Sequence, residues 1–232
     1  MGKLIVKLQS KEPGLVVSLV QNSLEAALAA QEAGADGLKL HVNLNHTQSG
    51  GKTGTLAEEK ERLQAILERV SIPVGLSSPH TLLRQQIEEV KSLGFDFVDF
   101  YASDLPVSSL NIPGIDKWVA IQPQFTPGMI QAVAKLSNVS VIEIGFLLSG
   151  NYRAPLTVED LARIHVVTQV ARAEGKPTLL PTDRFLSLED VAPLFEVGVK
   201  NIMIGVAVTG LEPSSIGQVT KTFRQTMDTT MV

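Results

Sequence analysis

The chain has 232 residues, of which 44% are hydrophobic, and its 20 basic and 24 acidic side chains give a net charge of −4. This composition favours a globular protein with a large core, and the lack of any basic block argues against a nucleic-acid partner. The absence of cysteine excludes disulfides, thiolate catalysis and cysteine-ligated metals. The apolar runs are strand-sized and no secretory signal is evident, so we expect no membrane span and a cytoplasmic protein.

Strand-like and helix-like segments alternate along the chain. Short apolar runs predict buried strands, and amphipathic stretches between them predict helices. The expected strands are residues 14–21, 37–43, 73–77, 95–102, 118–122, 140–147, 178–181 and 201–206, and the clearest expected helices are 23–32, 55–70, 81–93 and 158–174. This rhythm implies parallel pairing with right-handed crossovers. The length suits a barrel of ~200–250 residues, so we predict one (β/α)8 barrel domain over residues 1–232.

Two segments depart from the regular rhythm. Residues 3–8, Lys-Leu-Ile-Val-Lys-Leu, precede the strand at 14–21 and either cap the bottom of the barrel or form the first strand themselves. Residues 103–117 are rich in Pro, Ser and Asn and have little helical pattern. We therefore expect an irregular segment there in place of one barrel helix.

Polar residues late in the strands are the candidates for chemistry, because barrels bind ligands at the carboxyl ends of their strands. Lys39, His41 and Asn43 alternate with apolar residues and therefore share one side of their strand. We expect that side to face the barrel axis, since burying Lys39 beneath the helices would be far more costly. The alternative is a lysine that extends to solvent and a hydrogen-bonded core histidine.

Carboxylates inside apolar strands are a second signal. Glu143 interrupts the run Val-Ile-Glu-Ile, and Asp99 interrupts Phe-Val-Asp-Phe. Burial raises the pKa of such a group and a nearby cation lowers it, and either shift suits acid–base chemistry. We predict that Glu143 is the general base, kept ionised by a nearby cation, and that Lys39, His41 and Asp99 are its catalytic partners. Structural ion pairs would produce the same pattern.

The segment 43–55 is long for a strand-to-helix connection, and it is rich in glycine and threonine. A lid or an anion grip would fit this composition, and so would a flexible solvated loop. Its Gly-Lys-Thr is not a P-loop, because the first glycine of that motif is missing. The predicted substrate-contacting residues are Asn43, His46 and Lys52 of this segment, together with Gln122 and Asp183 near the ends of two other strands.

The sequence gives little support for a metal site. His41 and His46 are five residues apart, and His80 and His165 stand alone. We therefore predict no metal and no cofactor, while a Mg²⁺ ion held by carboxylates remains the open alternative.

The stretch 177–210 comprises a strand, a loop, a helix and a second strand, and it ends in a glycine-bearing turn. Ser187 is a suitable N-cap for the helix, and Gly198 ends it. The sequence Leu-Glu-Asp-Val…Gly-Val-Lys-Asn-Ile-Met-Ile-Gly-Val-Ala-Val-Thr resembles the last two strands of the phosphate-binding TIM barrels. That superfamily includes the ribulose-phosphate-binding barrels and the N-acetylmannosamine-6-phosphate 2-epimerases. The resemblance covers roughly the last quarter of the chain.

In that superfamily a Gly-x-Ala turn after strand eight is a phosphate seat, so the resemblance implies that Gly205, Val206 and Ala207 bind phosphate. The sequence Pro181-Thr182-Asp183-Arg184 stands where the family has a glycine pair. The implied function is an isomerase, epimerase, aldolase or lyase acting on a small phosphorylated metabolite. The alternatives are an FMN-binding oxidoreductase barrel and a non-catalytic binding barrel, and a homo-oligomer is compatible with all three.

Overall fold

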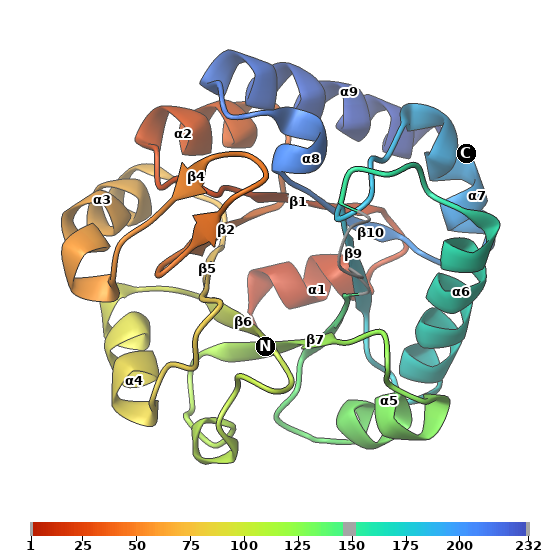
Figure 1. Ribbon diagram of the computed structural model, residues 1–232, viewed down its shortest axis with the longest axis horizontal. Coiled ribbons are helices and arrows are strands. Elements are labelled where there is room, and N and C mark those ends of the chain that lie inside the picture. Colours follow the sequence, from red (N-terminus) through yellow and green to blue (C-terminus); the bar gives the residue numbers. More distant parts are fainter. Residues whose placement is uncertain (1, 146–151, 231–232) are drawn as a thin grey trace.

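The computed structural model describes residues 2–145 and 152–230, and eight parallel strands in it close into one barrel. The barrel strands are β1 (Gly14–Ser18), β2 (Gly37–His41), β5 (Val74–Ser77), β6 (Phe97–Tyr101), β7 (Asp116–Ile121), β8 (Val141–Ile144), β9 (Thr178–Pro181) and β10 (Asn201–Ile204). Each strand pairs with its neighbour in the chain order, and β10 pairs with β1 to close the ring (Figure 1). The predicted (β/α)8 fold is confirmed.

Helices surround the barrel on its outer side (Figure 1). They are α2 (Leu24–Glu32), α3 (Leu56–Arg69), α4 (Arg84–Leu93), α5 (Pro127–Ala134), α6 (Val158–Ala173), α7 (Val191–Glu196) and α9 (Pro213–Thr230), with the 3₁₀ turns η1 (Val107–Ser109) and η2 (Leu188–Asp190). Thr55 and Thr157 each start a helix with a reciprocal capping box, which satisfies amides that have no partner within the helix. No helix in the described part of the chain is long and apolar enough to cross a membrane.

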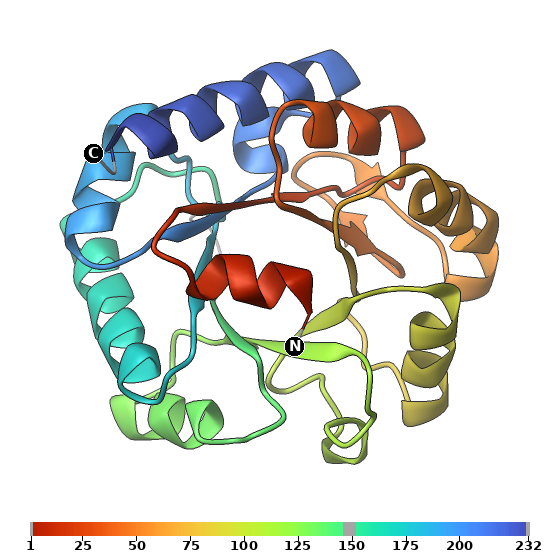
Figure 2. The ribbon, with the colours of Figure 1, turned by 180° about the vertical axis from the view of Figure 1, so that it is seen from behind.

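Residues 3–8 belong to a helix, α1 (Lys3–Gln9), which closes the amino-terminal end of the barrel (Figure 2). Leu4, Ile5 and Leu8 are buried on one side of this helix, whereas Val6 is 58% exposed. This stripe has helical rather than strand spacing. The first of the two alternatives for this segment is therefore correct, and β1 is the first barrel strand.

The inward-facing side chains of the strands form two layers. The lower interior, next to α1, is apolar and consists of Val16, Phe97, Trp118, Val141, Leu179 and Met203. The rings of Phe97 and Trp118 stack with their centroids 3.6 Å apart. Gly75 makes room for this pair, because a Cβ atom there would lie 2.0 Å from the Phe97 ring. Above this layer, Lys39, Asp99 and Glu143 form the polar upper interior.

Several element boundaries differ from the prediction. Strands β1 and β2 end at Ser18 and His41, earlier than expected, because the chain leaves the sheet there to form loops at the barrel mouth. Helix α4 begins at Arg84 instead of residue 81, and β7 begins at Asp116 instead of residue 118. Of the predicted strand 140–147, residues 146 and 147 lie outside the described residues. The irregular segment is confirmed, since η1 is the one helical turn within residues 103–115, all of which are described.

Candidate active site

A cavity of about 220 Å³ opens at the carboxyl-terminal end of the barrel, facing away from α1. All eight barrel strands contribute to its wall. The strand residues that line it are Ser18, Lys39, His41, Ser77, Asp99, Phe100, Tyr101, Ala120, Glu143, Pro181 and Met203. Barrel enzymes carry their active sites at this end, so the cavity is the candidate active site.

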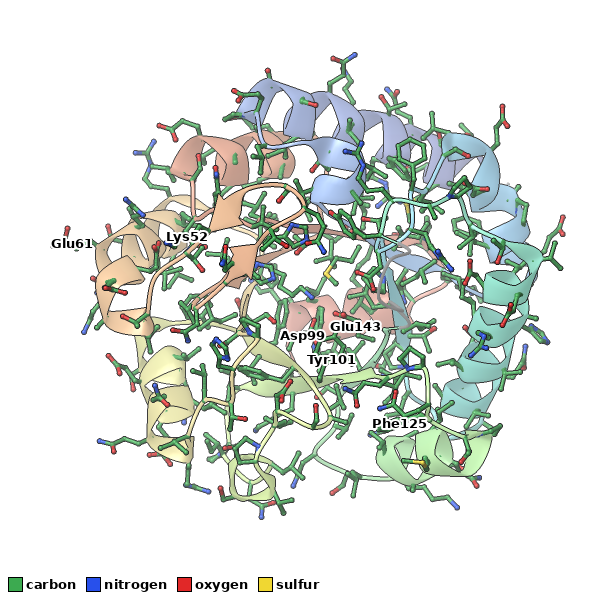
Figure 3. The ribbon with its side chains drawn as sticks, in the orientation of Figure 1. Lys52, Glu61, Asp99, Tyr101, Phe125 and Glu143 are labelled. Atoms are coloured by element: carbon green, nitrogen blue, oxygen red, sulfur yellow. The ribbon has the colours of Figure 1, made fainter. Side chains whose placement is uncertain are left out.

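The base of the cavity is an ion-paired cluster of three buried side chains. The Nζ atom of Lys39 lies 3.0 Å from Oδ2 of Asp99 and 2.9 Å from Oε2 of Glu143. These residues are only 7%, 1% and 6% exposed, respectively. Figure 3 shows Asp99 and Glu143 side by side within the ring of strands. The structure thus brings together three of the four predicted catalytic residues, but Lys39 and Glu143 touch directly instead of facing each other across a substrate.

Burial and neighbouring charges shift the pKa values in this cluster. Burial alone would lower the pKa of Lys39, but the carboxylates of Asp99 and Glu143 raise it above its ordinary value. Burial and the charge of Asp99 raise the pKa of Glu143 well above its ordinary value, against the opposing effect of Lys39. Burial also opposes ionisation of Asp99, yet Lys39 and a hydrogen bond with Glu143 lower the pKa of Asp99 overall.

The pKa of Glu143 is raised and that of Asp99 is lowered, so Glu143 is the one of the two carboxyl groups that takes up a proton more readily. Oδ1 of Asp99 is buried and has no hydrogen-bond donor among the described residues, and a protonated Glu143 would supply one. The predicted cation is present beside Glu143, but the pKa of Glu143 is raised overall, and its role as the general base stays a prediction. Lys39 contacts both carboxyl groups, and Asp99 is the one whose pKa is lowered.

His41 lies beside the cluster as a neutral imidazole. Its Nδ1 atom is 2.8 Å from the carbonyl oxygen of Leu19, and because a carbonyl only accepts, Nδ1 carries the proton. Burial and the charge of Lys39 lower the pKa of His41 to about 4. Nε2 is thus a hydrogen-bond acceptor, with no partner among the residues described. The predicted His41 lines the cavity as an acceptor and not as a cation.

The mouth of the cavity holds Tyr101, Tyr152 and Asp183. Burial is the main cause that raises the pKa of Tyr101, and the charge of Asp183 adds to it. Burial and the charge of Asp183 raise the pKa of Tyr152 to about 12. Both phenols are therefore protonated near neutrality and can donate hydrogen bonds. Neither tyrosine was among the predicted site residues, although Tyr101 follows Phe97 and Asp99 at the inward period of β6.

The segment 43–55 is a two-stranded hairpin, β3 (Asn45–His46) with β4 (Gly51–Lys52), and not an irregular loop. It begins at Asn43, which has a left-handed φ of 56° and donates from its amide side chain to Ser78. The ring of His46 meets that of Tyr152 edge-on, with centroids 5.0 Å apart. This contact joins the hairpin to the segment after β8 at the cavity mouth.

The turn after β10 leads directly into the short helix α8 (Val206–Thr209), and Gly205, Val206 and Ala207 all line the cavity. The amide of Gly205 donates to the hydroxyl of Thr182 at 2.8 Å. The amides of Val206 and Ala207 are in the first turn, where a helix offers them no partner, and no other described residue accepts from them. Two donors thus remain available at this edge of the cavity.

Three of the five predicted substrate-contacting residues do not line the cavity. Lys52 is exposed on β4 and lies toward α3 (Figure 3). Gln122 lies in the turn after β7, where the strand alternation has ended, and donates to Ser103. Asn43 does not line the cavity but shapes the start of the hairpin, whereas His46 and Asp183 do line it.

The donor set does not favour a metal ion. In the described parts of the chain, no three His, Asp or Glu residues are placed to hold one. The ammonium of Lys39 already occupies the position between Asp99 and Glu143 that a cation such as Mg²⁺ would need.

Solved structures share this fold at low sequence identity. Tryptophan synthase from Mycobacterium tuberculosis is similar with a TM-score of 0.74 and 10% identity, over 98% of this chain and 97% of that chain. Phosphoribosyl anthranilate isomerase from Thermus thermophilus has a TM-score of 0.67 and 10% identity, over 93% and 98%. An HpcH/HpaI aldolase from Desulfitobacterium hafniense has a TM-score of 0.66 and 11% identity, over 86% and 89%. The sequence matches no protein-family model and no curated protein. The chain therefore has the TIM-barrel fold, which it shares with enzymes of several different activities.

Proposed function

We propose that the protein is an enzyme that moves a proton on a small phosphorylated metabolite, in a reaction of the isomerase, epimerase or lyase type. The observation that carries this proposal is the cluster of Lys39 between Asp99 and Glu143 at the base of an open cavity. Buried ionisable groups cost several kcal/mol each unless they are well paired, and apolar side chains would fill the same space at lower cost. Strongly shifted groups gathered in a cleft are typical of catalytic sites.

The three side chains of the cluster have different roles in the proposed reaction. Glu143, which holds the shared proton, is the proton donor, and the ionised Asp99 is the proton acceptor. The ammonium of Lys39 can stabilise negative charge that develops on a substrate oxygen. Because the pKa of Lys39 is raised, this side chain is an electrostatic group and not a resting nucleophile for a Schiff base.

The phosphate is assigned to the turn after β10. The free amides of Val206 and Ala207 carry partial positive charge, and Gly205 leaves the backbone open to a ligand. The resemblance of this Gly-x-Ala turn to a phosphate seat supports the assignment. The cavity, as formed by the described residues, is smaller than the ~300–1,000 Å³ pockets that hold drug-sized ligands, so a small metabolite fits better than FMN.

Exchange of substrate hydrogen with solvent tests the proposal directly. Small phosphorylated aldoses, ketoses and oxo acids would be incubated with the protein in D₂O, and loss of carbon-bound hydrogen would be followed by NMR. We expect exchange with at least one of them. The Glu143→Gln protein should fold normally and exchange ~10²–10⁴-fold more slowly, because the amide keeps the shape but cannot donate an acid proton. A folded Glu143→Gln protein with an undiminished rate would contradict the proposal.

Two further variants serve as controls. Lys52→Met removes a cation outside the cavity and should leave exchange unchanged. For the phosphate, Gly205→Ala should be tolerated, since the added Cβ would lie 3.5 Å from the Ser18 Cβ, an ordinary contact. Gly205→Val should abolish the preference for phosphorylated over unphosphorylated compounds. If both Gly205 variants keep that preference, the phosphate lies elsewhere.

A further inference from the structure

Asp183 occupies a fixed position above the ion-paired cluster. It follows Pro181 of β9 at the inward period and lines the cavity. Its carbonyl accepts from the amide of Arg153 at 3.1 Å, and the amide of Phe185 donates to Ala154 at 3.0 Å. These two bonds hold the segment after β8 beside the segment after β9. Hydrogen bonds at Asp183 and at Phe185 therefore hold the backbone that carries the Asp183 side chain.

The carboxyl group of Asp183 has no hydrogen bond or ion pair with any residue that the structure describes. The neighbouring Arg184 is paired with Asp160 at 3.1 Å. Lys39 is the single Lys or Arg among the described residues that line the cavity, and it is paired with two other carboxyl groups. Among the described lining residues, three carboxyl groups accompany one ammonium, and the charge of Arg184, which does not line the cavity, also acts on Asp183. A positively charged ligand would balance the negative charge of the cavity lining.

Two aromatic side chains, Tyr101 and Tyr152, line the same cavity as this carboxyl group. The charge of Asp183 acts on both Tyr101 and Tyr152, raising the pKa of each, so the carboxylate lies near both phenols. Aromatic rings attract cations through their faces, and a carboxylate that shares a cavity with two of them favours a positive group over a neutral one. Burial raises the pKa of Asp183 against the opposing charges of Lys39 and Arg184, and a ligand cation held there would offset the effect of burial further.

We infer that Asp183 is a specificity-determining residue that binds a protonated amino group of the substrate between Tyr101 and Tyr152. The substrate class is then a small phosphorylated amine, with its phosphate at the turn after β10 and its ammonium at Asp183. The inference rests on the proposed function for the phosphate end alone. The amine end depends on the unpaired carboxyl group, its aromatic neighbours and the charge balance of the cavity.

Calorimetric titration with matched small probes tests the inference. The probes are 2-aminoethyl phosphate and 3-aminopropyl phosphate, their hydroxyl counterparts, and the unphosphorylated amino alcohols. We expect an amine probe to bind about tenfold or more tighter than its hydroxyl counterpart, because hydrogen bonds to charged partners are stronger than neutral ones. Asp183→Asn, which is isosteric and neutral, should remove that preference. Glu61→Gln makes the same charge change on the outer side of α3 and should leave it intact (Figure 3).

The outcomes separate the two proposals. Equal binding of amine and hydroxyl probes, or an amine preference that survives in Asp183→Asn, would overturn the inference and leave the phosphate assignment standing. Binding of the unphosphorylated amines that depends on Asp183, with no gain from phosphate, would support the inference and overturn the phosphate assignment. No measurable binding of any amine would overturn the inference as well.

Discussion

The lower and upper interiors of the barrel are built by the same strands but have opposite chemistry. Strand β6 places Phe97 in the lower layer and Asp99 in the upper one, and β8 does the same with Val141 and Glu143. The side chains of both layers are buried. A change of two residues along a strand therefore takes the interior from close-packed rings to an ion-paired cluster.

The two layers therefore have different roles: the lower interior stabilises the barrel, and the upper interior supplies the reactive groups of the cavity. Each apolar side chain of the lower interior stabilises the fold by about 1.5–3 kcal/mol, and α1 covers that layer from below. The upper interior carries charges whose desolvation offsets most of their mutual attraction. The apolar layer thus provides the stability, and the polar layer above it is where the chemistry of the chain is concentrated.

The largest effect on folding is expected in the lower interior. Trp118 is fully buried and stacked on Phe97, so Trp118→Ala should lower the free energy of unfolding by about 3–5 kcal/mol. Because no titratable group is removed, the loss should be the same at pH 5 and pH 8. Urea denaturation at the two pH values measures it. Trp118→Phe is the control: it keeps the stack, removes an indole N–H that has no partner among the described residues, and should cost much less.

Lys39→Met in the upper interior should cost less and depend on pH. Removing one partner of a buried ion pair typically costs 3–5 kcal/mol, and we expect about 3 kcal/mol at pH 8 because the raised pKa of Glu143 reduces the charge left without a partner. Without the ammonium, the pKa of Asp99 in the folded variant lies above its unfolded value. The folded variant then binds more protons than the unfolded chain, so its stability falls as pH rises.

The deficit of Lys39→Met relative to the native protein should therefore be larger at pH 8 than at pH 5, as measured by urea denaturation. Lys52→Met removes an exposed lysine and should change stability by less than about 0.5 kcal/mol at either pH. A deficit that does not change with pH would place the two carboxyl groups outside the influence of Lys39.

The strand alternation explains how much of this site the sequence could predict. Lys39, Asp99 and Glu143 each stand out as charged residues within apolar strands, and period-two geometry turns all three toward the axis. The barrel topology then places β2, which carries Lys39, opposite β8, which carries Glu143. The sequence could not reveal that Lys39 reaches both carboxyl groups, nor that the nearby charge of Asp99 raises the pKa of Glu143.

Features that depend on loops or on short apolar runs were beyond sequence analysis. Residues 3–8 have an apolar pattern that fits a strand or a helix, and only packing against the barrel decides between them. Tyr152 reaches the cavity because the segments after β8 and β9 run together at the bridge between Pro155 and Phe185. Nothing in the local sequence of either segment specifies that pairing.

The smallest effect concerns which carboxyl group holds the proton. The folded-state pKa of Glu143 is raised well above its unfolded value of about 4.3. Between these values the folded protein keeps a proton that the unfolded chain has lost. The contribution of Glu143 to stability is thus fully present below pH ~4.3 and falls by up to about 1.4 kcal/mol per pH unit as pH rises toward the folded pKa. Glu143→Gln removes this slope.

Between pH 5 and pH 8, Glu143→Gln should therefore gain stability relative to the native protein as pH rises, by roughly 1 kcal/mol per unit in urea denaturation. The difference between the two proteins cancels the contribution of His41, whose pKa is lowered to about 4 in both. Asp99→Asn should behave in the opposite way. The pKa of Asp99 is lowered, so its contribution is present above the unfolded pKa and is lost as pH falls through the folded one. That variant should be less stable than the native protein at pH 8, with a deficit that shrinks toward acid. If the two variants exchanged these behaviours, the proton would reside on Asp99, and the roles of donor and acceptor in the proposed reaction would be reversed.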